Sequence, residues 1–338
     1  MWYGCRHHIS ELIIKAVWGA LFVEDLQPDN KFFTSIKNSW HHLDTRPDTQ
    51  IVSLDGNLYK KEEALSFYRE VLDTRNKKNE LLLRDDYREV AETSMMLLGE
   101  TPRENMSWKK PGPTHKARFM PYSIYTNKAV AFSDQMEELG MDMEVLPNIV
   151  RVARFNTTIY APYFLKSSVG CDAPYNDLKM FQDLYNYFII DPVVAKASLD
   201  ILNRHTWYLQ EQTVPFSLFS KKLSEDDKSQ LAAKILTFEA MKPVHWDSEL
   251  LPGQKSYDLK KPELDILVTA STKLVDLVGP NSFMLWDILG LDWDWLRVSP
   301  SLWEEFPSFK EMKDYVRTVK VTNDVAERGV KVLIEKLN

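Results

Sequence analysis

The clearest helical pattern in the chain lies near its start, where residues 5–21 read CRHHISELIIKAVWGAL. Apolar residues recur there every three or four positions: Ile9, Leu12, Ile13, Ala16, Val17, Ala20 and Leu21. This spacing places them along one face of an α-helix. Glu11 and Lys15 interrupt the apolar run, which is atypical of a secretory signal peptide. The stretch therefore predicts an amphipathic helix.

The same period continues along most of the chain. It predicts helices over residues 61–73, 80–98, 116–140 and 147–160, within 181–219, after the capping Ser224, near 263–277 and 282–289, and over 323–337. Gly99 followed by Pro102 marks the end of one helix, and Pro215 is expected to kink or end another. Strand signals are confined to two weak candidates, 50–54 and 318–321. We therefore expect a mainly α fold.

The amino-acid composition and net charge exclude several classes of protein. The 338 residues are 44% hydrophobic and 27% charged, which suits a folded protein with a sizeable core. Eleven glycines are too few for a β-sandwich or propeller with many tight turns, and two cysteines cannot form a disulfide framework. The net charge of -7 excludes a generally basic nucleic-acid binder. No apolar run reaches the length of a membrane span, so we expect no membrane partner. The two cysteines are consistent with a reducing, intracellular compartment such as the cytoplasm.

Cys5 and His8 form a C-x-x-H motif, with Glu11 one helical turn beyond His8. A thiolate and an imidazole at this spacing can share a zinc ion if two more ligands are supplied, but no second ligand pair with finger-like spacing follows. The alternative is structural: Cys5 packs in the core and His8 serves as a hydrogen-bonded cap or core histidine. The spacing alone favours the structural alternative.

Residues 323–330, NDVAERGV, place the Glu327 carboxylate in the first turns of the last predicted helix. Ala326 and Gly329 flank it and would permit close approach of another wall of a cleft. The alternative is that Asn323 or Thr322 caps the helix while Asp324 and Glu327 favour the positive end of the helix dipole.

Residues 103–128 are locally basic in an acidic chain. Six cations stand against Glu104, a local net charge of +5: Arg103, Lys109, Lys110, Lys116, Arg118 and Lys128. The aromatic residues Trp108, Phe119, Tyr122 and Tyr125 are interleaved with them. Cations with aromatics suit phosphate neutralisation and base stacking. A solvated loop whose aromatic side chains face the core fits the same pattern equally well.

The tryptophans of residues 286–303 stand among acidic residues. Acidic neighbours disfavour a DNA-binding role, so these tryptophans are interpreted as core and interface residues.

Five motifs in order carry a resemblance to a known family. They are residues 5–12 (CRHHISEL), 84–89 (RDDYRE), 111–120 (PGPTHKARFM), 205–209 (HTWYL) and 323–330 (NDVAERGV). Together they resemble an invertebrate family of transposase-derived proteins of the hAT-like type, which has an RNase H-like core and a C-x-x-H motif. The resemblance spans nearly the whole chain, and it alone implies a nuclear location, since no compact run of lysine and arginine resembles a localisation signal.

The resemblance implies a fold and a metal site. In such enzymes two aspartates and a distant glutamate hold two divalent ions, Mg²⁺ or Mn²⁺, for attack on DNA phosphodiesters. By resemblance, Cys5 and His8 match the C-x-x-H motif and Glu327 matches the catalytic, metal-binding glutamate. Residues 1–30 would then be a core segment, 31–310 a helical insertion domain with a linker at 243–262, and 311–338 the last core helix. Packing of the first and last helices would bring Cys5, His8 and Glu327 together.

Two departures limit what the resemblance implies. The family's two aspartates precede the C-x-x-H motif, whereas no acidic residue precedes Cys5 here, so we expect an N-terminally incomplete chain. The Arg-Trp pair of the family is Arg118-Phe119 here, which weakens the expected stacking role. One carboxylate cannot hold two metals. We therefore expect no metal bound by this chain alone and no DNA cleavage.

Two functions remain open from the sequence. The first is a transposase-like DNA-binding or strand-transfer protein that is catalytically incomplete. Its expected DNA contacts are Arg103, Lys109, Lys110, Lys116, Arg118 and Phe119. The second is a domesticated helical module that binds protein without catalysis, in which self-association is one expected mode.

Overall fold

The computed structural model describes residues 4–22, 30–73, 84–102, 106–112, 120–241 and 268–322. All regular structure within these ranges is helical, and no strand occurs in them. The prediction of a mainly α fold is confirmed. No helix in these ranges is both long enough and apolar enough to cross a membrane.

The chain divides into two compact units, each assembled from segments that are separate in the sequence. The first unit comprises residues 1–7, 167–183 and 202–338, and the second comprises 8–166 and 184–201. Residues 31–310, expected as one insertion domain, are thus distributed over both units.

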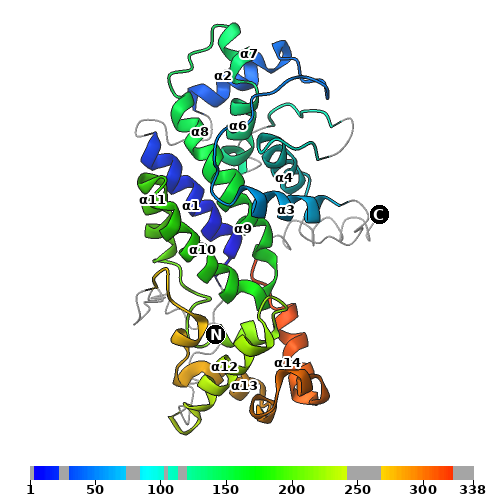
Figure 1. Ribbon diagram of the computed structural model, residues 1–338, viewed down its shortest axis with the longest axis vertical. Coiled ribbons are helices and arrows are strands. Elements are labelled where there is room, and N and C mark those ends of the chain that lie inside the picture. Colours follow the sequence, from blue (N-terminus) through cyan, green and yellow to red (C-terminus); the bar gives the residue numbers. More distant parts are fainter. Residues whose placement is uncertain are drawn as a thin grey trace, which may run out of the picture. The chain divides into compact units, whose positions relative to one another are not determined.

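The second unit contains most of the longer helices (Figure 1). They are α1 (Arg6–Leu21, which begins in the first unit), α2 (Lys31–Ser39), α3 (Lys61–Leu72), α4 (Asp85–Leu97), α6 (Met120–Ala131), α7 (Ser133–Glu138), α8 (Leu146–Phe155), α9 (Ala161–Leu165) and the part of α11 (Pro192–Leu202) up to Ile201. A 3₁₀ turn, Trp40–His42, follows α2. Helices α3, α4 and α8 confirm predicted helices, and the predicted 116–140 helix is interrupted at Phe132, between α6 and α7.

Helix α6 lies at the centre of this unit. Every one of its residues is buried, and it packs against α4 and α8 (Figure 1). A helix buried on all sides is normally apolar all round. Helix α6 instead carries Ser123, Thr126, Asn127 and Lys128 in its buried surface. These polar groups require partners inside the core.

Residues 50–54 were expected to be a strand, and that prediction is wrong. The segment runs irregularly beside helix ends, where the Val52 amide donates to the carbonyl of Ala131 at 2.9 Å and the Leu54 amide donates to that of Leu97 at 2.8 Å. Ala131 ends α6 and Leu97 ends α4. The last carbonyls of a helix have no partner within it. The segment therefore bonds to two helix ends and not to another strand.

Gly99 ends α4 as predicted. Its φ of 93° lies in the left-handed region that favours glycine. The Gly99 amide donates to the Met96 carbonyl, and the Glu100 amide donates to that of Met95. These bonds satisfy carbonyls that the last turn of a helix leaves open.

A π-helical turn, Asn156–Tyr160, joins α8 to α9. Pro162 lacks an amide hydrogen, and its ring would clash with the carbonyl of Thr158 four residues earlier in a regular α-helix. The wider turn relieves this clash. The Thr158 hydroxyl also donates back to the Arg154 carbonyl at 2.8 Å.

The first unit consists of shorter helices. They are the part of α10 (Ala173–Tyr187) up to Asp183, α12 (Glu225–Leu236), α13 (Met284–Leu289) and α14 (Pro307–Thr318), with 3₁₀ turns at Lys166–Ser168, Gly170–Asp172, Val214–Phe219, Glu239–Met241, Leu274–Leu277, Pro280–Phe283, Asp294–Arg297 and Pro300–Glu305. Pro215 lies at the start of a 3₁₀ turn, not inside or at the end of an α-helix.

Buried tryptophans form the core of the first unit, as their sequence context predicted. Trp286, Trp295 and Trp303 are each at most 1% exposed. The Trp295 ring meets the rings of Trp303 and Phe309 edge-on, each with a centroid separation of 4.9 Å. Edge-to-face packing of this kind adds stabilisation beyond area burial.

The first described residues of the chain are fixed in this unit by Arg6. Its amide donates to the carbonyl of Val321 at 2.9 Å, and its buried guanidinium pairs with Asp177 and donates to the carbonyl of Ser167 at 2.9 Å. The Tyr208 hydroxyl donates to the Gly4 carbonyl at 2.6 Å. The start of the chain is thereby joined to residues as late as Val321.

The remaining predicted elements divide into two groups. Residues 268–273 are irregular and 274–277 form a 3₁₀ turn, so the helix expected near 263–277 is wrong there. The strand expected at 318–321 is also wrong, because Thr318 ends α14 and no strand follows within the described residues. The linker at 243–262 and the helix at 323–337 lie outside the described residues.

Candidate functional site

The C-x-x-H motif does not form a buried site. Cys5 is half-buried immediately before α1, and the His8 side chain in the first turn is 58% exposed. Its Nδ1 lies 3.7 Å from a Glu11 carboxylate oxygen. Of the two structural roles considered for His8, cap or core histidine, its exposure excludes the core role, whereas the neighbouring His7 is buried.

Only part of the metal site implied by the resemblance lies among the described residues. Among the described residues, no three histidine, cysteine, aspartate or glutamate side chains are placed to hold a metal ion. Glu327 lies outside the described residues, so its expected proximity to Cys5 and His8 stays a prediction.

The basic loop is divided by the structure. Lys109 and Lys110 are exposed, whereas Arg103, Lys116, Arg118 and Phe119 lie outside the described residues. Lys128, counted among the basic residues of this region, is 1% exposed and pairs with Glu89 at 2.6 Å. It therefore cannot contact a phosphate at the surface. Burial lowers the pKa of its ammonium group, and the Glu89 carboxylate opposes that effect.

The described aromatics of this region face the core. Trp108 is 5% exposed, and its ring meets that of Phe132 edge-on at 5.0 Å. Tyr122 and Tyr125 are also buried. The alternative interpretation of the pattern, aromatic side chains that pack inward beneath a solvated loop, holds for these residues.

A buried polar cluster connects α4, α6 and the π-helical turn. The Asn127 amide donates to the hydroxyls of Thr93 and Ser94 at 3.0 and 3.1 Å, and the Asn156 amide donates to the Asn127 side-chain oxygen at 2.9 Å. The Tyr68 hydroxyl donates to the Thr157 carbonyl at 2.7 Å. Buried polar networks of this kind fix the relative register of the helices that they join.

Tyr160 lies in the same turn and stays protonated. Burial raises the pKa of its phenol well above the ordinary value, and the Glu11 carboxylate adds to this effect. A phenol held neutral is no nucleophile. The cluster is therefore suited to positioning helices, and the sequence signal that locates it is the run of polar residues in α6.

The turn between α10 and α11 exposes four apolar side chains that lie within six positions of one another, which the sequence did not indicate. Ile189 is 89% exposed, Ile190 53%, Phe188 45% and Val193 42%. We call these four residues the apolar turn. In sequence they resemble the end of an apolar helix face, and only the structure shows that they are uncovered.

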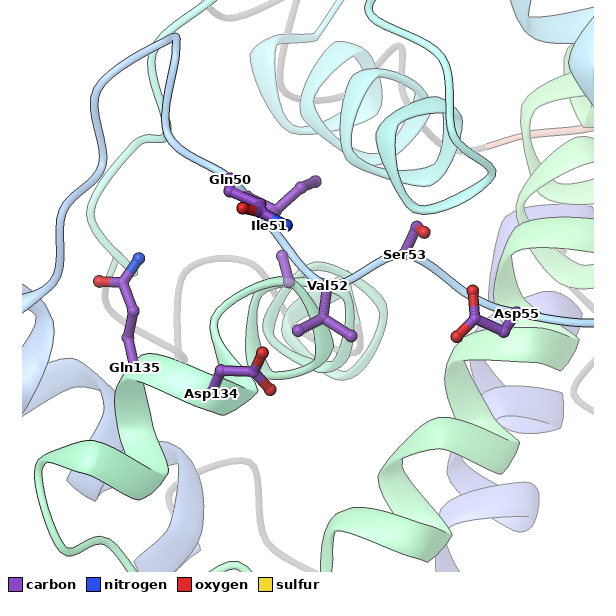
Figure 2. A pocket seen from close by; sticks show the side chains of 8 residues that line it. Gln50, Ile51, Val52, Ser53, Asp55, Asp134 and Gln135 are labelled. Carbon is purple, nitrogen blue, oxygen red and sulfur yellow. The ribbon is translucent and has the colours of Figure 1, made fainter.

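A hollow of about 380 Å³ lies beside the irregular segment that follows α2. Its lining residues are Gln50, Ile51, Val52, Ser53, Asp55, Ala131, Asp134 and Gln135. Figure 2 shows Asp134 and Gln135 on a helix beside the irregular segment that carries the other labelled residues. The Gln135 side chain is already engaged, because its oxygen accepts the Asp44 amide at 2.7 Å. The volume falls within the range of small ligand sites.

No model of a protein family, no curated protein and no solved structure matches this chain.

Proposed function

We propose that the protein is a helical interaction module that associates with another protein through the apolar turn. The observation that carries this proposal is the contiguous exposure of Phe188, Ile189, Ile190 and Val193. Single exposed apolar residues are ordinary on protein surfaces, whereas a contiguous group is typical of a binding surface.

The apolar turn is held in one conformation by Asp191. Both Asp191 carboxylate oxygens accept from the Arg151 guanidinium at 2.8 Å, and one also accepts the Val194 amide at 3.1 Å. The amides of Ile190 and Asp191 donate to the Tyr187 carbonyl at 2.9 Å. A surface fixed before binding loses less conformational entropy when it binds.

A second copy of the chain is the partner that we propose. Lys196 and Asp200 follow Val193 along α11 and pair with each other at 2.8 Å. Residues three and four apart share a helix face, so the apolar turn is bordered by one cation and one anion. Two such surfaces related by a two-fold axis through the apolar turn place apolar side chains against apolar side chains. This arrangement makes the surface complementary to itself.

The association is tested by sedimentation velocity over a range of protein concentrations. We expect a monomer–dimer equilibrium in the unaltered protein and a monomer in Ile189→Asp, because a buried unpaired carboxylate opposes the contact. The matched control is Ile288→Asp, since Ile288 is equally apolar, 53% exposed and located on α13. The proposal is wrong if the two variants sediment alike or if the unaltered protein is monomeric throughout.

A second candidate function, DNA binding, is favoured by the support beneath Lys109 and Lys110. The Lys128 ammonium donates to the Lys109 carbonyl at 2.7 Å, and the Tyr125 hydroxyl donates to that of Gly112. Buried Trp108 precedes the two exposed lysines. The loop therefore presents two cations from a fixed backbone, in agreement with the resemblance to a transposase-derived family.

DNA binding is tested by titrating duplex DNA at several salt concentrations. We expect Lys109→Gln/Lys110→Gln to weaken binding and to reduce the slope of log affinity against log salt by up to about 2, because each phosphate contact contributes about 0.9. The control pair is Lys221→Gln/Lys234→Gln, which removes two exposed lysines elsewhere. Equal slopes in both double variants would remove this candidate.

A further inference from the structure

The hollow beside residues 50–55 has an open backbone edge. Val52 and Leu54 donate their amides to helix ends, as described above. Hydrogen bonds that residues two positions apart donate toward the same side are typical of an extended backbone. In an extended backbone the residues between them direct their amides and carbonyls toward the opposite side. Within the described part of the chain, no hydrogen bond engages the backbone of Ile51 or Ser53. Both residues line the hollow.

An aspartate lies at each end of the hollow. At one end Asp134, exposed in the first turn of α7, forms no ion pair in the described structure. At the other end the Arg154 guanidinium lies 3.5 Å from the main-chain carbonyl of Asp55, and the Asp55 carboxylate likewise forms no ion pair in the described structure. Figure 2 shows the Asp134 carboxylate directed toward Val52. The hollow therefore carries two carboxylates without a charged partner among the described residues, and that of Asp134 is the one directed toward Val52.

We propose that the hollow binds an extended peptide segment, which pairs with the backbone of Ile51 and Ser53 and places a lysine or arginine side chain at Asp134. An extended segment added to a free backbone edge gains main-chain hydrogen bonds, and side-chain pockets supply the specificity. The lining supports a peptide over an apolar ligand, because five of its eight residues are polar: Gln50, Ser53, Asp55, Asp134 and Gln135.

The first measurement compares two probe peptides by fluorescence anisotropy. One is a blocked, labelled hexapeptide of alternating lysine and valine, and the other replaces each lysine with glutamate. We expect the lysine peptide to bind about tenfold or more tightly than the glutamate peptide. Equal affinities, or no binding of the lysine peptide at millimolar protein, would overturn the proposal.

The net charge of -7 attracts any cationic peptide weakly, so the site is tested by substitution. Asp134→Asn is expected to weaken the lysine peptide about two- to fivefold, as for an exposed ion pair. Glu138→Gln removes the same charge from the exposed end of the same helix, outside the hollow, and should leave binding unchanged. Equal effects of the two variants would show general charge attraction and refute the site.

The backbone edge is tested by proline, which removes an amide hydrogen. Ser53→Pro deletes a donor that makes no bond within the described structure, so it should preserve stability and weaken the lysine peptide about three- to tenfold. Val52→Pro deletes the bond to Ala131 and should lower the unfolding midpoint. If Ser53→Pro stays folded and binds normally, pairing along this edge is excluded. If it unfolds, the neighbouring Ile51→Pro makes the same test at the other free amide.

Discussion

The Asp191 side chain both caps a helix and pairs with an arginine. Its carboxylate caps the first turn of α11 and accepts two hydrogen bonds from Arg151. Burial by itself raises the pKa of this carboxyl. The hydrogen bonds from Arg151 and from the amides of Val194 and Val193, together with the charge of Arg151, lower the pKa further than burial raises it, and the net result lies below the ordinary value of 3.8.

This balance predicts a pH-dependent contribution to stability. Because the folded pKa of Asp191 lies below its unfolded value, its stabilisation is complete above about pH 3.8 and is lost as the pH falls through the folded pKa. We expect Asp191→Asn to lower the free energy of unfolding by roughly 1–3 kcal/mol near neutral pH, and the difference to shrink in acid. Urea unfolding at several pH values measures it. Asp200→Asn, an exposed partner of Lys196, should change stability by less than about 1 kcal/mol.

A difference between unaltered and Asp191→Asn protein that stays constant with pH would contradict the argument. It would show that the lost stability comes from altered hydrogen-bond geometry and that the charge of Asp191 makes no contribution. Since Asp191 also holds the apolar turn, the same variant should weaken self-association less than Ile189→Asp does.

At the scale of single helices, the sequence predicted a helix end correctly where one side chain determines that end. Ser224 was predicted to cap a helix, and its hydroxyl accepts the Asp227 amide at 3.1 Å at the start of α12. Gly99 was predicted to end α4 and does so. In both cases the deciding contact lies within a few residues of the signal.

Local signals failed where the partner is distant in sequence. Residues 50–54 have the β-branched and apolar character of a strand, but their hydrogen bonds go to Leu97 and Ala131. The burial of Lys128 depends on Glu89, and the apolar turn is exposed because nothing in the described structure covers it. Helical period specifies which residues share a face, but not what packs on that face.

The Ser224 cap is expected to contribute measurably to the stability of α12. Ser224→Ala should lower the free energy of unfolding by about 1 kcal/mol, because the Asp227 amide loses its acceptor. Ser229→Ala on the same helix is the control, since Ser229 is exposed and alanine has the higher helix propensity. Thermal unfolding followed by circular dichroism measures both. Equal losses in the two variants would show that the cap contributes nothing specific.

At the scale of the whole molecule, the sequence predicted helix content but not the division into units. The expected boundaries followed the order of motifs, whereas each unit is built from separate segments. Residues 167–183 belong to the first unit because their contacts are there. Gly170 approaches α14 so closely that a Cβ would lie 2.9 Å from the Val316 carbonyl, and Asp172 accepts the Ser220 hydroxyl at 2.6 Å. Such contacts leave no periodic signal in the sequence.

The interleaved division predicts unequal behaviour of two fragments cut at residue 201. Fragment 8–201 contains every residue of the second unit, including the buried helix α6 and its polar cluster. We expect it to give a near-ultraviolet circular dichroism signal and a cooperative urea transition. Fragment 202–338 retains the tryptophan core but lacks Arg6 and residues 167–183, and with them the bond to Val321 and the close contact with α14. We expect this fragment to unfold without a sharp transition, because its core loses one of the segments that cover it. A cooperative transition in 202–338 and none in 8–201 would show that the segments assigned to each unit are not the ones that stabilise it.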